Sequence, residues 1–139
     1  MNAWNGQSRL KIAVLIDVDG TLASAYRDGR RKLRPSALKV IKFLSSNAPV
    51  FLWSIAGKEN GERLIEEFSE LRPYIQGCWD KAEFPLDMVD YPYCIDDLDL
   101  DEAVLQCNHV ILGYTWDGGD DPADLAEAAR IIVEAIKAH

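Results

Sequence analysis

A run of five apolar residues, at positions 12 to 16, ends directly in two carboxylates and a glycine, Asp17-Val18-Asp19-Gly20. An apolar run of this length, closed by a turn signal, is typical of a strand that is buried on both faces of a parallel sheet. In open α/β sheets, ligands bind beyond the carboxyl ends of such strands. The run therefore predicts a central strand with two acids at the ligand-binding edge of a sheet.

The spacing of the two acids indicates what that edge binds. Residues i and i+2 of a strand share a face, so Asp17 and Asp19 converge if the strand geometry continues through them. Two carboxylates that converge repel each other unless a cation lies between them, and Mg²⁺ prefers oxygen ligands of this kind. The alternative is an acidic turn that is solvated and inert.

Short apolar runs alternate with amphipathic stretches along the rest of the chain, which indicates βαβ units and a parallel sheet. Pro92 is expected to prevent the third strand from starting much earlier than Tyr93. The expected strands are 10–16, 50–54, 93–95 and 110–113, and the expected helices are 35–46, 61–71, 100–107 and one that starts at Asp121-Pro122.

Composition restricts the class of protein. At 139 residues, with 48% hydrophobic and 27% charged residues, the chain is expected to form one globular domain over residues 1–139. The longest apolar run, of five residues, is too short for a membrane span, and residues 1–9 lack the apolar core of a signal peptide. We therefore expect no membrane partner and a cytoplasmic location.

Cysteine and histidine add few candidates for chemistry. Cys78, Cys94 and Cys107 are odd in number and show no Cys-x-x-Cys spacing, which argues against a disulfide framework or a zinc site. The chain has two histidines, and His139 is its last residue. His109 opens an apolar strand, where a structural role is the expected one.

The charges are unevenly distributed. The net charge of −8 argues against general nucleic-acid binding. Between Arg27 and Arg34, five basic residues face the single acid Asp28, so this segment carries +4 and the rest of the chain −12. Asp28-Gly29 is a signal for a two-residue hairpin. The segment is either a solvated loop or a site that attracts an anionic substrate.

The string of apolar residues followed by Asp17-x-Asp19-Gly20-Thr21-Leu22 resembles the first motif of the haloacid dehalogenase superfamily, whose members are mostly phosphatases. The resemblance implies that Asp17 is a nucleophile and Asp19 a general acid and base. It also implies a phosphate-binding Ser or Thr after the second core strand, then a basic residue, then acids after a later strand. Ser54, Lys81 and the pair Asp96-Asp97 follow in that order.

Two of these later assignments leave alternatives open. Lys58 competes with Lys81 as the lysine that neutralises the nucleophile, although Lys81 fits the order of the family motifs better. For the metal, the resemblance favours Asp97 as a direct ligand and keeps Asp96 in the site. The series Asp97-x-Asp99-x-Asp101 imitates the start of a calcium-binding EF-hand loop, but Glu102 stands where that loop needs glycine.

The resemblance implies a three-layer, Rossmann-like domain with a mostly parallel sheet and an Mg²⁺-dependent phosphatase that works through an aspartyl-phosphate. Asp17, Asp97 and the backbone carbonyl of Asp19 would hold the Mg²⁺, with Thr21 and Ser54 near the phosphate. Ser54-Ile-Ala-Gly departs from the family pattern because it lacks the arginine that often follows the serine. The alternative is a catalytically idle or receiver-like regulatory module with the same fold.

The space between the motifs is too short for the cap domain with which many members of the family select substrates. A hairpin flap over about residues 23–34 is expected in its place, with Arg30 and Arg31 near the pocket mouth to hold further phosphates. An open site favours a bulky or polymeric phosphorylated substrate, and nucleic acid only as a phosphorylated end. Otherwise a partner or a second copy of the chain would close it.

Overall fold

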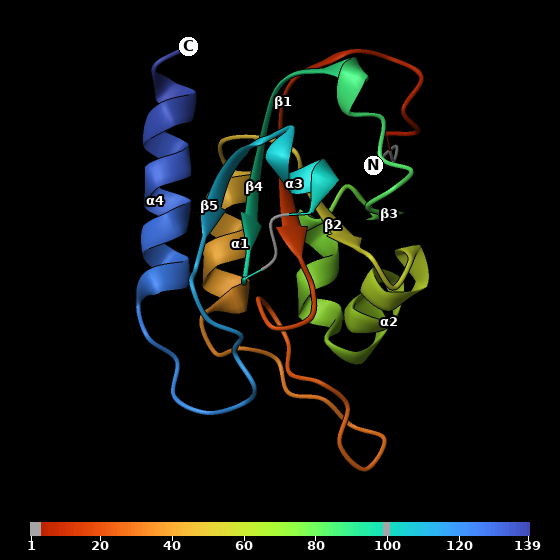
Figure 1. Ribbon diagram of the computed structural model, residues 1–139, viewed down its shortest axis with the longest axis vertical. Coiled ribbons are helices and arrows are strands. Elements are labelled where there is room, and N and C mark those ends of the chain that lie inside the picture. The colour runs from red at the N-terminus through yellow and green to blue at the C-terminus, as the bar shows by residue number, and fades with distance from the viewer. Residues whose placement is uncertain (1–3, 99–100) are drawn as a thin grey trace.

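In the computed structural model, which describes residues 4–98 and 101–139, the chain folds as an α/β domain around one all-parallel sheet (Figure 1). The described residues contain five strands in the order β3-β2-β1-β4-β5, which is a Rossmann-like arrangement. The strands are β1 (Leu10–Asp17), β2 (Val50–Ser54), β3 (Gly77–Asp80), β4 (Val89–Asp96) and β5 (Asn108–Ile111). The expected α/β fold with a central parallel sheet is confirmed.

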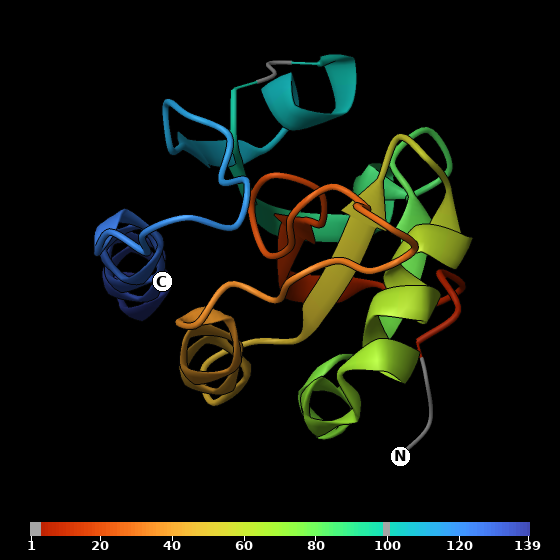
Figure 2. The same ribbon diagram turned by 90° about the horizontal axis from the view of Figure 1, so that it is seen from below.

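The helices cover the two faces of the sheet unequally. The longer helices are α1 (Ala37–Ser45), α2 (Lys58–Glu67) and α4 (Asp124–Lys137), and the short elements are α3 (Glu102–Leu105) and the 3₁₀ helices η1 (Ser69–Tyr74) and η2 (Leu86–Met88). Figure 2 shows α1, α2 and α4 on one side of the sheet and α3 on the other. The third layer of the fold therefore consists of short elements.

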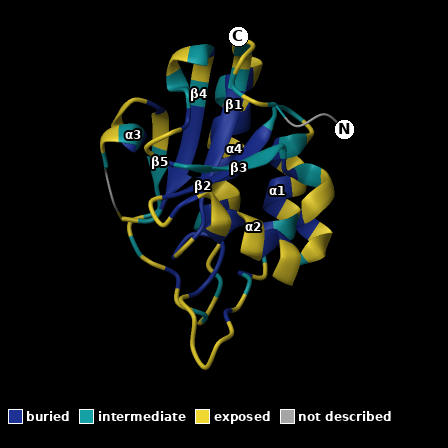
Figure 3. Cartoon of the chain, turned by 90° about the vertical axis from the view of Figure 1, so that its right-hand side faces the viewer, coloured by how far each residue is buried: buried dark blue, intermediate teal, exposed yellow. Residues whose placement is uncertain are grey.

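Side chains alternate along β1 between two cores. Val14 and Ile16 face the larger core under α1, α2 and α4, whereas Ala13 and Leu15 face a second core that is rich in aromatic residues. The continuous dark strands of Figure 3 show that the middle of the sheet is buried from both sides. This alternation places Asp17, the next odd-numbered residue of β1, on the side of the second core.

The strand predictions were wrong for β3 and β4, and β5 starts at Asn108, two residues before the expected strand 110–113. β3 was not predicted, because Gly77-Cys78-Trp79-Asp80 is short and has neither an apolar run nor a regular alternation. β4 starts at Val89 and includes Pro92. Proline lacks the N–H that a strand donates to its neighbour, but at Pro92 that position faces β5, where the Asn108 side chain donates to the Pro92 carbonyl. β5 begins opposite Tyr93, one residue later, so no hydrogen bond of the β4–β5 ladder is lost.

The predicted helix boundaries also shift. α2 runs from Lys58 to Glu67 instead of over the expected residues 61–71, and the chain continues into η1, which contains Pro73. α4 starts at Asp124, not at Asp121. The Asp121 carboxylate is bound elsewhere, because it accepts hydrogen bonds from Arg34 Nε at 2.7 Å and from the Ser36 N–H at 2.7 Å.

The predicted hairpin flap is confirmed. Arg27 and Arg30 exchange backbone hydrogen bonds of 2.7 and 3.0 Å, and between them Asp28 and Gly29 have φ angles of 54° and 74°. Two residues with positive φ form the turn that matches the twist of a hairpin. In Figure 1 the flap, residues 23–34, projects as the orange loop at the lower end of the molecule.

None of the helices in the described ranges is both long and apolar enough to cross a membrane.

Candidate active site

Three of the predicted acids meet where β1 and β4 end. Asp17 is the last residue of β1, Asp96 is the last residue of β4, and Asp97 follows it. One carboxylate oxygen from each of the three lies within 4.8 Å of the other two. The Asp17 carboxylate also accepts a hydrogen bond of 3.0 Å from Thr21 Oγ1, which fixes its orientation. We call these three residues the acidic cluster.

Lys81 is the lysine that contacts the acidic cluster. It follows β3 directly, and its ammonium lies 3.3 Å from Asp17 Oδ1 and 2.6 Å from Asp96 Oδ2. The same ammonium lies 3.1 Å from Asp101 Oδ2, and Asp101 also caps α3 by accepting from the Val104 N–H. Lys58 is exposed at the start of α2. The geometry and the order of the motifs therefore both favour Lys81 over Lys58 as the lysine that neutralises the proposed nucleophile.

The acidic cluster has more negative charge than Lys81 can balance. Burial, together with the charge of Asp96, raises the pKa of Asp17 well above its usual range. Burial likewise raises the pKa of Asp96 to about 6, although Lys81 acts in the opposite direction. Burial disfavours the charged form of Lys81, but Asp17 and Asp96 outweigh it and raise the Lys81 pKa above its usual value. Lys81 therefore keeps its charge, and the pKa shifts mean that Asp17 and Asp96 hold their protons to higher pH than ordinary carboxyl groups do.

Asp97 is held by the loop that follows β5. Its Oδ2 accepts a hydrogen bond of 2.8 Å from Thr115 Oγ1. Burial disfavours the ionised form of Asp97, but contacts with Asp96 and Thr115 lower its pKa overall. Gly20 has a φ of 79°, and a Cβ on it would lie 2.5 Å from Asp97 Oδ2. Gly20 therefore leaves room for the Asp97 carboxylate, which a larger residue would displace.

The donor set of the acidic cluster fits a hard divalent cation. It offers carboxylate oxygens only, it has an excess of negative charge, and it lies at the carboxyl edge of a parallel sheet. Asp19 is not part of it, since its side chain is 52% exposed and points to other partners. The predicted contact of the Asp19 backbone carbonyl with the metal stays a prediction.

Asn60 organises the other side of the site, and the sequence reading missed it. Its amide donates to Asp19 Oδ2 at 2.8 Å and to Ser54 Oγ at 3.1 Å, and its Oδ1 accepts from Arg31 at 2.8 Å. Asn60 is buried on the inner face of α2. We call Asn60, Ser54, Asp19 and Arg31 the Asn60 network. An asparagine among the apolar inner positions of a helix was the one signal available.

Arg31 lies deeper than expected. Its side chain is fully buried, and besides Asn60 it lies 3.5 Å from Asp19 Oδ1 and 3.4 Å from Glu67 Oε1. The Tyr26 ring covers the guanidinium at 4.7 Å. This geometry makes Arg31 a support for Asp19. Arg30, in contrast, is exposed on the flap, and direct contact of either residue with substrate stays a prediction.

A cavity of about 440 Å³ joins the acidic cluster to the Asn60 network. Asp17, Asp19, Ser54 and Lys81 all line it, together with the segment 115–117 from the loop after β5. That loop is fixed to the first motif, because the Trp116 N–H donates to the Gly20 carbonyl at 2.8 Å. The loop therefore forms a wall of the site, a point that the sequence leaves open.

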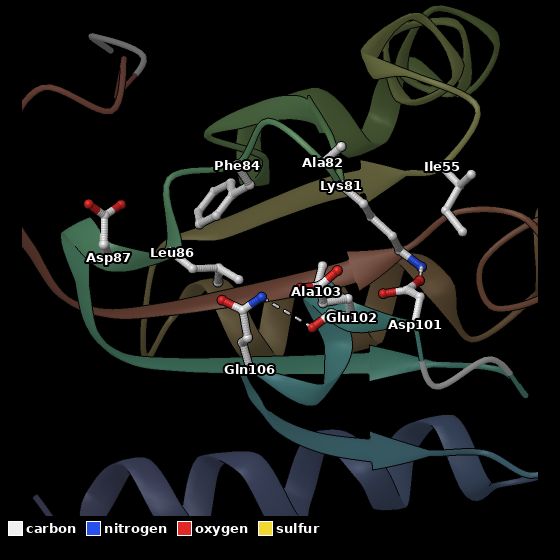
Figure 4. Close-up of a pocket in the computed structure, with 10 residues that line it drawn as sticks. All are labelled: Ile55, Lys81, Ala82, Phe84, Leu86, Asp87, Asp101, Glu102, Ala103 and Gln106. Carbon is white, nitrogen blue, oxygen red and sulfur yellow. Dashed lines mark hydrogen bonds and ion pairs between the residues drawn. The ribbon is translucent and has the colours of Figure 1, made fainter.

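A second cavity, of about 520 Å³, adjoins the first at Ile55 and Lys81 (Figure 4). In Figure 4 the Lys81 ammonium points toward Asp101, with Phe84 and Leu86 at the opposite side of the cavity. Asp87 and Glu102 add two exposed carboxylates to its lining. This cavity combines apolar walls with negative charge, so it does not suit an anionic group.

The calcium alternative loses support here. Asp99 lies outside the described residues. Asp101, the last acid of that series, is occupied by Lys81 and by the first turn of α3.

Comparison with known proteins leaves the chain without a family assignment. No protein-family model matches it, and no curated protein matches it significantly in sequence. What the fold and the site define is an α/β domain with an acidic, lysine-paired centre at the carboxyl edge of its sheet. The resemblance to the haloacid dehalogenase superfamily stays a prediction from the four motifs.

Proposed function

We propose that the protein is an Mg²⁺-dependent phosphatase of the haloacid dehalogenase type, which hydrolyses phosphomonoesters through an aspartyl-phosphate. The observation that supports this most is the position of Asp17. Its carboxylate lies at the end of the central strand, in contact with Lys81 and in the acidic cluster, and it lines a cavity that Ser54 and Asp19 also line. A nucleophile, a charge-neutralising group and an acid–base group are thus within one cavity.

Asp17, Asp96 and Asp97 would hold the Mg²⁺ through their carboxylates. When bound, the ion supplies positive charge that offsets the repulsion between a phosphate ester and the carboxylate nucleophile. Lys81 supplies further positive charge next to Asp17 Oδ1.

In the first step a carboxylate oxygen of Asp17 attacks phosphorus and the bond from phosphorus to the ester oxygen breaks. Asp19 donates its proton to the leaving oxygen. In the second step Asp19 takes a proton from water, the water oxygen attacks phosphorus, and the bond between phosphorus and Asp17 breaks. Inorganic phosphate and an alcohol are the products, and both aspartates return to their starting states.

In this proposal Ser54 donates to the phosphoryl group, and Thr21 orients the nucleophile. Ser54 Oγ accepts hydrogen bonds from the Ala56 N–H at 3.1 Å and from Asn60, so its own proton is available to a phosphoryl oxygen. Thr21 fixes the second oxygen of Asp17. The attacking oxygen therefore belongs to a carboxylate whose rotation is restricted.

The substrate class follows from the openness of the site. The segment after β1 forms a hairpin flap rather than a cap domain, so we propose a bulky or polymeric phosphorylated substrate, with a partner or second copy as the other way to close the cavity. The three cysteines are free, which suits a cytoplasmic location.

The test is hydrolysis of p-nitrophenyl phosphate with and without Mg²⁺. We expect wild-type protein to require Mg²⁺ and Asp17→Asn to reduce turnover to background, because the amide is not a nucleophile. Equal activity of Asp17→Asn and wild type would contradict the mechanism.

One observation favours a second candidate, a receiver-like module that accepts phosphate but does not hydrolyse it. Asn60 and Arg31 hold the Asp19 carboxylate. If these contacts keep it away from the attacking water, an aspartyl-phosphate has no base to hydrolyse it. Labelling with acetyl phosphate separates the two functions. A phosphatase gives steady release of phosphate, whereas a receiver gives a stable adduct on Asp17.

A further inference from the structure

A cavity under the flap adjoins the candidate active site. It measures about 510 Å³ and lies between the basic side of the flap and the loop after β5. Ala25 and Asp117 line both this cavity and the one that holds Asp17. The two cavities therefore adjoin at Ala25 and Asp117, so a group bound under the flap would lie next to the site of Asp17.

The lining of the flap cavity is strongly basic. Arg27, Arg30 and Lys32 are exposed and line it. Asp117 is the one acid among the lining residues, and it lies 3.9 Å from Arg27, with both side chains more than 70% exposed. Such a pair is weak in water. The cavity therefore keeps an excess of positive charge even when Arg31, which is neutralised within the Asn60 network, is left out.

A glycine loop forms the opposite wall. Gly118 and Gly119 line the cavity, and in the described part of the chain their backbone N–H groups donate to no protein acceptor. Gly118 has a φ of 104°, and it lies close to the Lys32 side chain, because a Cβ added to Gly118 would be 3.3 Å from Lys32 Cδ. Free N–H groups of a glycine loop next to cationic side chains are a recurrent way of binding anions.

The charge of the rest of the protein favours anion binding at the flap cavity over other parts of the surface. Outside residues 27–34 the chain carries a charge of −12, so an anion is repelled from most of the surface. The other neighbouring cavity, shown in Figure 4, exposes Asp87 and Glu102. Of these two neighbouring cavities, the one under the flap has the described lining that carries complementary charge for an additional anionic group of a substrate.

We propose that the flap cavity is a second anion site, which binds a phosphate or other acidic group of a substrate whose scissile phosphate lies at Asp17. The inference rests on the proposed phosphatase function and names its substrate class: phosphomonoesters with a second anionic group. Arg30 and Lys32 bind that group, and the Gly118-Gly119 loop donates to it.

The experiment measures binding of phosphonates, which cannot be hydrolysed, to the wild-type protein with Mg²⁺ by isothermal titration calorimetry. The probes are straight-chain α,ω-bisphosphonates, alkylphosphonates of the same chain lengths, and ω-carboxyalkylphosphonates. At the chain length that spans the two cavities, we expect the bisphosphonate to bind about 10–100-fold more tightly than the alkylphosphonate, as one charge-assisted contact or more implies. The carboxylate probe separates a preference for phosphate from a preference for any anion.

The double variant R30Q/K32Q is expected to bind both types of probe with the affinity of the alkylphosphonate. Both side chains are exposed, so the substitution leaves the core unchanged. K39Q, which removes an exposed charge from α1, is the matched control and keeps the selectivity. Equal binding of the two probe types to wild type, or unchanged selectivity in R30Q/K32Q, would overturn the second anion site.

Failure of this site and failure of the phosphatase are distinguishable. Selective binding that depends on Arg30 and Lys32, without any hydrolysis of p-nitrophenyl phosphate, contradicts the enzyme but supports an anion cavity. Hydrolysis without selectivity contradicts the cavity alone.

Discussion

The acidic cluster and the Asn60 network lie across one cavity, yet they are built in different ways. The carboxylates of the acidic cluster come from the ends of two neighbouring strands, and Asp17 and Asp96 are buried. The Asn60 network joins a helix, a strand end and the flap, and its Asp19 side chain is half exposed. The difference indicates that the acidic cluster is fixed by the sheet, whereas the position of Asp19 depends on two other elements.

Asp19→Asn is expected to have the largest effect on kcat among the variants that distinguish the Asn60 network from the acidic cluster. Removing a general acid and base typically costs ~10²–10⁴-fold in rate, while the acidic cluster is left intact. We therefore expect kcat for an alkyl phosphate to fall by about that factor, with Mg²⁺ affinity unchanged. Steady-state kinetics and a Mg²⁺ titration check both statements. Asp90→Asn, at an exposed position early in β4, is the control and keeps full activity.

A smaller effect is expected for Asn60→Asp, which tests whether the network positions Asp19. The substitution keeps an acceptor for Arg31 but removes the donor to Asp19 and Ser54. Loss of a hydrogen bond to a charged group is worth about 1.5–3 kcal/mol, so kcat is expected to fall by about 10–100-fold.

Asn47→Asp, after α1 at the opposite edge of the sheet, is the matched control for that variant. If kcat falls as much in the control as in Asn60→Asp, the amide at position 60 does not position Asp19.

The smallest expected effect concerns the acidic cluster and depends on pH. The raised pKa of Asp96, about 6, means that the metal-free folded protein binds this proton more tightly than the unfolded chain does. That contribution favours folding below the ordinary carboxyl pKa and is lost as the pH rises through about 6. Mg²⁺ should replace it where the acids are ionised.

We therefore expect Mg²⁺ at about ten times its Kd to raise the free energy of unfolding by about 1.4 kcal/mol near neutral pH. At about pH 5 protons compete for the ligands, and the same Mg²⁺ concentration should stabilise less. Urea unfolding at the two pH values measures the difference. Asp97→Asn should lose the stabilisation, and a Mg²⁺ effect that grows as the pH falls would contradict the assignment of the ligands.

The sequence predicted the acidic cluster better than the Asn60 network for a physical reason. A buried strand has a strong apolar signal, and acids directly after it are easy to recognise, so Asp17 and Asp96-Asp97 were found. Asn60, Asp101 and Thr115 come from a helix and two loops, whose positions depend on packing between distant segments. Apart from the asparagine among the apolar inner positions of α2, no local pattern marks such residues before the fold is known.

The same limit applies to the fold. The alternation of apolar runs and amphipathic stretches predicted the parallel sheet and the approximate positions of α1, α2 and α4. It missed β3, an edge strand held mainly by its pairing with β2. It placed the start of α4 at Asp121 because the local cap signal gave no hint of Arg34, a buried guanidinium that binds this carboxylate from another segment.

The central claim, that Asp17 is the nucleophile, is tested most directly by trapping its phosphorylated form. p-Nitrophenolate leaves without help from an acid, so Asp19→Asn should complete the first step with p-nitrophenyl phosphate and stall at the second, which needs a base. The reaction is stopped in acid and the peptides are analysed by mass spectrometry. The account predicts a phosphate adduct on the peptide that contains Asp17, present with Mg²⁺ and absent after chelation. An adduct on another residue, or steady turnover with no adduct, would contradict it.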